Sequence, residues 1–160
     1  MKYFYILIMI LLSLNVKADN SFEYILNSHF KPDGLQFSFT DGTAYSTFNM
    51  LGSWTDNYRN FGSANCTGQI HTNKKNEVKI YGVCEMKDEA DIKRWITLER
   101  DFGVTEIGVG KSKQIDAEGF WKILTGIDCN YAIKHGKEYS YSITKCKISK
   151  DQHVRLSAKK

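Results

Sequence analysis

The positions of four cysteines constrain the fold of this chain more than any other feature of its sequence. Cys66 and Cys84 lie at equal distances from the centre of a turn-like segment near residue 75, and Cys129 and Cys146 flank the His135–Glu138 segment in the same manner. Opposed residues of two antiparallel strands lie within disulfide reach. The spacing therefore predicts two β-hairpins, each closed by its own bridge, Cys66–Cys84 and Cys129–Cys146.

The residues between the cysteines support these two registers. In the first hairpin the cysteine face is also the more apolar face, as expected for the side turned toward a core. The cysteine pairings place Gly68 opposite Gly82, Ile70 opposite Ile80, Thr72 opposite Val78, Tyr131 opposite Thr144 and Ile133 opposite Ser142.

Short runs of β-branched and aromatic residues between Gly, Asn and Asp clusters recur along the rest of the chain, which favours an all-β fold. Further strands are predicted at Leu35–Phe39 before an Asp41-Gly42 turn, at Ala44–Leu51, Trp95–Arg100, Gly103–Gly110 and Gly119–Ile127. About eight sequential antiparallel strands can close into a single up-and-down β-barrel, which leaves no exposed edges. A β-sandwich is the alternative. A helical turn is expected only at Met86–Ile92 or at Phe22–Ser28.

The first eighteen residues have the layout of a secretory signal peptide. Lys2 precedes an apolar run, and Val16 and Ala18 place small residues before a cut at Asp19. The apolar run is shorter than the roughly 20 residues that span a bilayer. We therefore expect residues 1–18 to be removed and the mature chain to be periplasmic or extracellular, without stable membrane insertion. An even number of cysteines suits that oxidising compartment.

The net charge of the mature protein limits the class of partner that we expect. Removing residues 1–18 removes two lysines and no acidic residue, so the net charge falls from +4 to +2. So mild a charge predicts no nucleic-acid partner. Residues 19–150 are expected to form one monomeric β-barrel domain, and residues 151–160 a basic, disordered tail.

Several short motifs resemble known sites, but none predicts a chemistry. Asp88-Glu89-Ala90-Asp91 spells a helicase motif without the other parts of that machinery, and it fails as a calcium loop because ligand positions after it are apolar or basic. These carboxylates are expected to be solvated, with a looser cation site as the alternative. Gly108–Ser112 lacks the first glycine of a phosphate loop. We find no nucleophile motif and expect no metal, no cofactor and no catalytic residue.

The three tryptophans are the candidate ligand-binding residues. Trp54, Trp95 and Trp121 offer large flat surfaces, and glycines at Gly68, Gly82, Gly103, Gly108, Gly110 and Gly126 would leave space wherever they face inward. An eight-stranded barrel can either be filled or hold one small ligand. The first expectation is a barrel that binds a small apolar or amphipathic molecule. The alternatives are an envelope interaction protein with a filled barrel and a barrel isomerase or cyclase.

Two resemblances to known families accompany this interpretation. Gly52-Ser53-Trp54 resembles the lipocalin G-x-W signature, in which the tryptophan plugs the closed end of the barrel. A wider pattern resembles a family of small exported bacterial proteins of unassigned function, similar to allene-oxide-cyclase-like barrels. It comprises Gly52–Asn57, Tyr58–Gly62, Cys66-x-Gly68, Gly82-x-Cys84, Gly108-x-Gly110 and Gly119–Gly126 up to Cys129. This resemblance implies a fold and no reaction.

Overall fold

The structure, a computed structural model, describes residues 21–103 and 107–159. The predicted signal peptide and its cleavage site lie outside these residues. The described elements are β1 (Phe22–Asp33), β2 (Gln36–Ser38), β3 (Ala44–Asp56), β4 (Phe61–Thr72), β5 (Val78–Asp88), β6 (Lys93–Gly103), β7 (Ile107–Ala117), the 3₁₀ helix η2 (Gly119–Leu124), β8 (Asp128–His135), β9 (Ser140–Ile148) and α2 (Lys150–Ala158).

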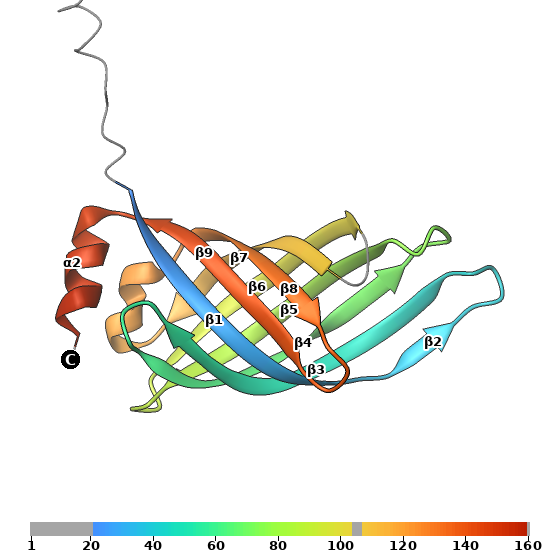
Figure 1. Ribbon diagram of the computed structural model, residues 1–160, viewed down its shortest axis with the longest axis horizontal. Coiled ribbons are helices and arrows are strands. Elements are labelled where there is room, and N and C mark those ends of the chain that lie inside the picture. Colours follow the sequence, from blue (N-terminus) through green and yellow to red (C-terminus); the bar gives the residue numbers. More distant parts are fainter. Residues whose placement is uncertain (1–20, 104–106, 160) are drawn as a thin grey trace, which may run out of the picture.

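Eight of the strands form a closed antiparallel barrel (Figure 1). Each strand from β3 to β9 pairs with the next in sequence, β9 pairs with β1, and β1 returns to pair with β3. The short strand β2 pairs with β3 and lies outside the ring, where it extends past the barrel as a hairpin arm. The predicted up-and-down barrel is confirmed, in preference to the sandwich.

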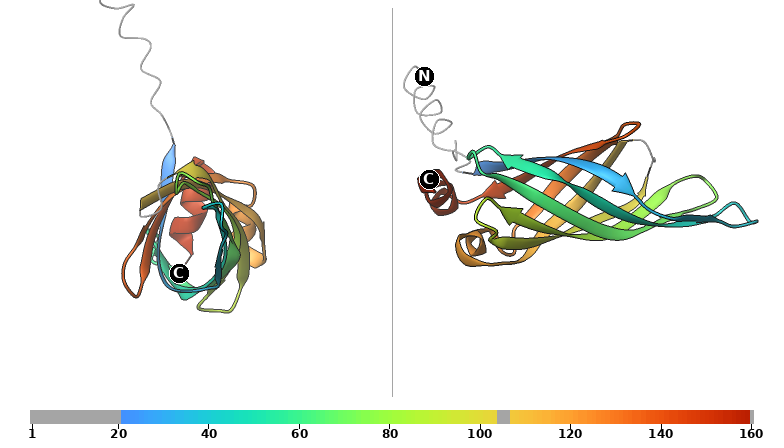
Figure 2. Two further views of the ribbon diagram at one scale, coloured as in Figure 1. Left: turned by 90° about the vertical axis from the view of Figure 1, so that its right-hand side faces the viewer. Right: turned by 90° about the horizontal axis from the view of Figure 1, so that it is seen from below.

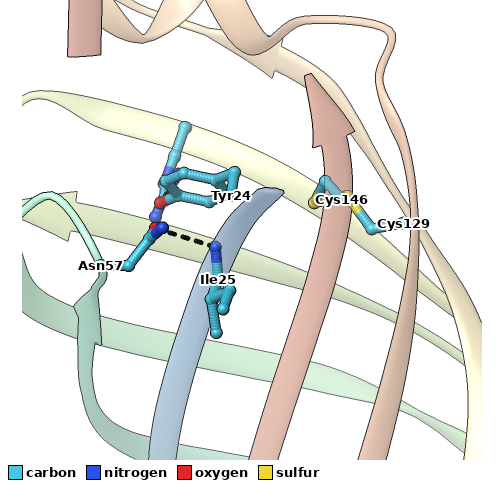
Figure 3. The surroundings of a disulfide bond; sticks show 6 residues. Tyr24, Ile25, Asn57, Cys129 and Cys146 are labelled. Carbon is cyan, nitrogen blue, oxygen red and sulfur yellow. Dashed lines mark hydrogen bonds between the residues drawn. A yellow bond between two sulfur atoms is a disulfide. The ribbon is translucent and has the colours of Figure 1, made fainter. Parts of the chain in front are cut away.

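Both predicted disulfides are present and lie within single hairpins. Cys66 on β4 faces Cys84 on β5 with their Cα atoms 3.9 Å apart, and Cys129 on β8 faces Cys146 on β9 with their Cα atoms 4.3 Å apart. The five residue pairings predicted around them are also observed. Figure 3 shows the second bridge beside β1, where the side chain of Asn57 accepts a hydrogen bond of 2.9 Å from the backbone N–H of Ile25.

Local structure differs from the prediction in two segments. Gly119–Ile127, predicted as a strand, forms η2, because Gly119 and Gly126 adopt positive φ angles of 49° and 86° and Trp121 and Leu124 share one buried helical face. Phe22–Ser28, one of the two places expected for a helical turn, is instead part of β1. Its alternating side chains point to the core and to solvent. The other place, Met86–Ile92, is the end of β5 and a hairpin turn.

The boundary between β6 and β7 also differs from the prediction. The segment Gly103–Gly110 was expected to be one strand, but Gly103 ends β6 and β7 runs over Ile107–Ala117. The hairpin turn at Asp41-Gly42 is confirmed, with Gly42 at a φ of 87°.

The basic C-terminus is a helix rather than a disordered tail. Ser149 and Gln152 form a capping box that starts α2, and the Leu156 side chain is completely buried against the barrel. Composition alone favoured a solvated tail because four of the residues from 150 to 160 are lysine or arginine. The capping signal and one apolar anchor outweigh that composition.

The glycines on the inner wall do not create a cavity, because large side chains occupy the space beside them. A Cβ atom added at Gly68 or Gly82 would lie 2.5 or 2.7 Å from the ring of Phe48. A Cβ atom at Gly108 would overlap the Arg100 guanidinium, and one at Gly110 would lie 2.5 Å from the ring of Tyr131. The expectation that inward-facing glycines leave volume unfilled is wrong for these four, since each accommodates a neighbouring side chain.

Two small cavities lie inside the barrel, each of about 20 Å³. The walls of both include Leu26, Ile96 and Thr144. A space of this size holds one water-sized occupant. The interior is therefore a packed core that spans most of the barrel.

Candidate functional site

Two of the three candidate tryptophans meet at the end of the barrel that η2 and α2 cover. The Trp54 and Trp121 rings lie edge to face with their centroids 5.7 Å apart, and both side chains are buried. The guanidinium carbon of Arg94 lies 4.5 Å from the Trp54 ring centre and 4.2 Å from the Trp121 ring centre. A desolvated cation over two indole faces is attracted by both, and each such contact contributes about 2 kcal/mol.

Asp88 at the end of β5 connects the same end of the barrel to α2. One carboxylate oxygen accepts hydrogen bonds from Trp121 Nε1 at 2.9 Å and from Lys159 Nζ at 2.8 Å, and the other accepts the backbone N–H groups of Ala90 and Ile92. Burial opposes ionisation of this carboxyl, but the hydrogen bonds outweigh burial and lower the pKa of Asp88. The solvated carboxylate expected from the sequence is instead a buried anchor.

Tyr24 joins Arg94 to a second acidic residue. Arg94 Nη1 donates to the Tyr24 hydroxyl at 2.8 Å, and that hydroxyl also interacts with Asp56. Asp56 in turn accepts hydrogen bonds from the backbone and side chain of Asn60, at 2.9 and 2.8 Å. Burial raises the pKa of Tyr24, so its hydroxyl keeps its proton and remains a donor.

Helix α2 lies across this end of the barrel, as the view along the strands in Figure 2 shows. The His153 ring stacks on Phe22 with a centroid distance of 4.1 Å and its Nδ1 lies 2.7 Å from the Tyr58 hydroxyl. Gln152 Nε2 donates to the backbone carbonyl of Ile123 at 2.6 Å. The covered end is thus held by side chains from β1, the β3–β4 turn and α2 and by the backbone of η2.

The structure separates the third candidate tryptophan from the other two. Trp95 alternates with the inward-facing Arg94 and Ile96 on β6, is half-buried on the outer wall and lies opposite Glu85 of β5. Trp54 and Trp121 are core residues, so the three tryptophans line no common pocket. Sequence reasoning missed Arg94, although a charged residue in phase with the apolar face of a predicted strand is a recognisable signal.

A second polar group lies inside the barrel at its other end. Burial raises the pKa of Tyr131, and the nearby Arg100 charge opposes this rise. Packing around the ring and then the same Arg100 charge lower the pKa of His135, whose Nδ1 lies 2.8 Å from the hydroxyl of the buried Ser140. Arg100, Tyr131 and Ser140 are buried, whereas His135 is exposed at the end of β8.

The outer wall formed by β7, β8 and β9 has an uneven charge. Of its thirteen outward positions with described side chains, five are lysines and two are aspartates. We call these residues the cationic wall: Val109, Lys111, Lys113, Ile115, Asp116, Asp128, Asn130, Ala132, Lys134, Tyr141, Ile143, Lys145 and Lys147. The net charge of +3 on this wall exceeds the +2 predicted for the whole mature chain.

An apolar ridge crosses the cationic wall. Val109 pairs with Ala132, and Ala132 pairs with Ile143, so the three side chains line up across three strands. Shallow grooves of about 530 and 380 Å³ lie on the two sides of this ridge. Val109 is 69% exposed and Ile143 is 40% exposed. Apolar side chains that line up in this way on an otherwise charged wall are a feature of interaction surfaces.

The described part of the chain offers no group of three or more His, Cys, Asp or Glu side chains that could hold a metal ion. Neither of its two helices has the length and apolar character needed to cross a bilayer. Comparison with models of known protein families, with curated proteins and with solved structures finds no match to this chain. The two disulfides indicate an oxidising environment.

Proposed function

We propose that this protein is an exported interaction protein of the cell envelope, with a filled barrel that binds an anionic partner on the cationic wall. The observation that carries the proposal is the line of Val109, Ala132 and Ile143 among five lysines and two aspartates. Interaction surfaces combine an apolar centre with a polar rim, and opposite charge steers the partner.

The interior supports this proposal over the binding of a ligand inside the barrel. Sites for small molecules usually have volumes of about 300–1,000 Å³, whereas the two interior cavities are about 20 Å³ each. Phe48, Arg100 and Tyr131 fill the space beside the inner glycines. A ligand of fatty-acid size would have to displace these side chains.

The partner that fits best is a protein with an acidic, extended segment. Grooves on both sides of a ridge accept alternate side chains of an extended chain, while a lipid surface is too flat to enter them. The ion pairs Lys113–Asp128 and Lys145–Glu23, at 3.5 and 3.7 Å, are exposed and therefore weak. An acidic partner can replace them at little cost.

A peptide-binding measurement tests the proposal. The probe is a dye-labelled ten-residue peptide of alternating Glu and Val, titrated at low salt with fluorescence anisotropy as the readout. The double variant Lys111→Glu/Lys134→Glu should weaken binding about tenfold or more, since each lost contact contributes up to about 1 kcal/mol. The matched control Lys31→Glu/Lys75→Glu carries the same charge change away from the wall and should change binding less than about threefold.

A second binding measurement, with lipid vesicles, distinguishes a protein partner from a membrane surface. Vesicles with anionic lipids should bind wild type no better than the control variant. If the vesicles bind through the wall lysines and the peptide does not, the partner class is wrong. If neither probe binds, the proposed function fails.

A further inference from the structure

Arg94 has more hydrogen-bond donors than the protein satisfies. The side chain is 2% exposed, and its Nη1 donates to Tyr24. Its Nε and Nη2 atoms are fully buried and have no hydrogen-bond acceptor among residues 21–103 and 107–159. Buried donors without acceptors are rare in folded proteins, and a guanidinium adds a full charge to that cost.

One of the two interior cavities lies beside this guanidinium. Its walls include Arg94 and three buried polar side chains, Ser112, Gln114 and Thr144. The two hydroxyls can donate hydrogen bonds, and the Gln114 amide, which already donates to the backbone carbonyl of Trp121 at 2.8 Å, has a second N–H. No aspartate or glutamate lines the cavity. Its volume of about 20 Å³ admits a single atom-sized occupant and excludes sulfate, phosphate and carboxylic acids.

The acidic residues nearby are already engaged. Asp88 accepts from Lys159 and Trp121, and Asp56 accepts from Asn60 and interacts with the Tyr24 hydroxyl. Within the described residues, Arg94 forms no ion pair with a carboxylate. A water molecule in the cavity would satisfy hydrogen bonds but would leave the positive charge without a partner, whereas an anion provides both.

We propose that this cavity binds one chloride ion. Nε and Nη2 of Arg94 are the principal ligands, and Ser112, Gln114 and Thr144 complete the shell. The Trp54 and Trp121 rings pack over the same guanidinium and keep it buried. The bound ion is a structural part of the covered end, and this inference does not depend on the proposed function.

Thermal unfolding in different sodium salts at constant ionic strength tests the site. Chloride and bromide should raise the midpoint by about 3 °C or more over gluconate, with a saturable dependence on concentration. Sulfate stabilises folded proteins in general because it is excluded from their surfaces, and this effect does not saturate. We expect sulfate to cause no saturable rise in the midpoint. Ser112→Ala and Thr144→Val should reduce the halide effect, while the control Thr97→Val, on the outward face of β6, should retain it.

Bromide quenching of tryptophan fluorescence provides a second readout that needs no Arg94 variant. In a Trp95→Phe protein the remaining indoles are Trp54 and Trp121, both packed against the guanidinium that would bind the ion. Bromide should quench them with a saturable curve, and crystals grown in bromide should show an anomalous peak in the cavity. Equal midpoints in chloride and gluconate, linear quenching and no anomalous peak would together mean that the cavity holds only water and that the proposal is wrong.

Discussion

The ammonium group of Lys159, just after α2, lies 2.8 Å from the carboxylate of Asp88 at the end of β5. The Asp88 side chain is 2% exposed, so this ion pair is shielded from water on one side. Because 71 residues separate the two partners, the contact fixes the end of the chain against the covered end of the barrel.

Replacing Lys159 should therefore destabilise the protein. Lys159→Met leaves Asp88 with three other donors, so we expect a loss of about 1–2 kcal/mol in the free energy of unfolding rather than the larger loss seen when a buried charge is left alone. Urea unfolding measures this loss, and Lys150→Met, at the other end of α2, is the control. The double variant Asp88→Asn/Lys159→Met should lose less than the sum of the two single changes.

The same carboxyl should make stability depend on acid pH. The folded-state pKa of Asp88 lies below its ordinary value of 3.8. The ionised form therefore stabilises the fold above that value, and the stabilisation disappears as the pH falls through the lower folded-state pKa. Unfolding midpoints of wild type and Asp88→Asn should converge below pH 3.8. A constant difference between them from pH 7 to pH 2 would contradict this assignment.

Phe48 should be a sensitive core position on β3. Phe48→Ala removes the ring that lies against Gly68 and Gly82, and we expect a loss of about 3–5 kcal/mol with a new internal cavity. The exposed Phe61 is the matched control, and Phe61→Ala should cost less than about 1 kcal/mol. If Phe48→Ala were as mild as the control, the packed interior would be in doubt.

Each disulfide should stabilise the fold independently. The bridges close loops with sequence separations of 18 and 17 residues, and the chain-entropy model gives about 3 kcal/mol for each. Cys66→Ala/Cys84→Ala and Cys129→Ala/Cys146→Ala should show similar losses in denaturant unfolding. Addition of a reductant should lower wild-type stability but leave the quadruple alanine variant unchanged.

Processing at the N-terminus is open to direct measurement. The exported protein should have the intact mass of a chain that starts at Asp19, because Val16 and Ala18 suit the signal peptidase cleft. Detection of a mature species that still begins with Met1 would show that the segment is retained.

The barrel and both disulfides could be predicted from the sequence because opposed cysteines fix a strand register. The structure of the barrel end that η2 and α2 cover could not be predicted. Gly119–Gly126 alternates like a strand, but positive φ angles at its two terminal glycines turn it into η2, and only tertiary contacts reveal this. Trp54 and Trp121 were identified as binding residues because rings can line a pocket as well as fill a core. Their position around Arg94 depends on long-range pairing that local patterns do not contain.

The pairing of β1 with β9 has a consequence for the order of folding. Phe22 pairs with Ile148, so the ring can close only after nearly the whole chain has been synthesised, and such distant contacts form slowly. The β4–β5 and β8–β9 hairpins need only local contacts, and each contains its own cysteine pair. We therefore expect both thiol pairs to oxidise while the ring is still open, so that correct disulfide formation requires no isomerase to reshuffle them.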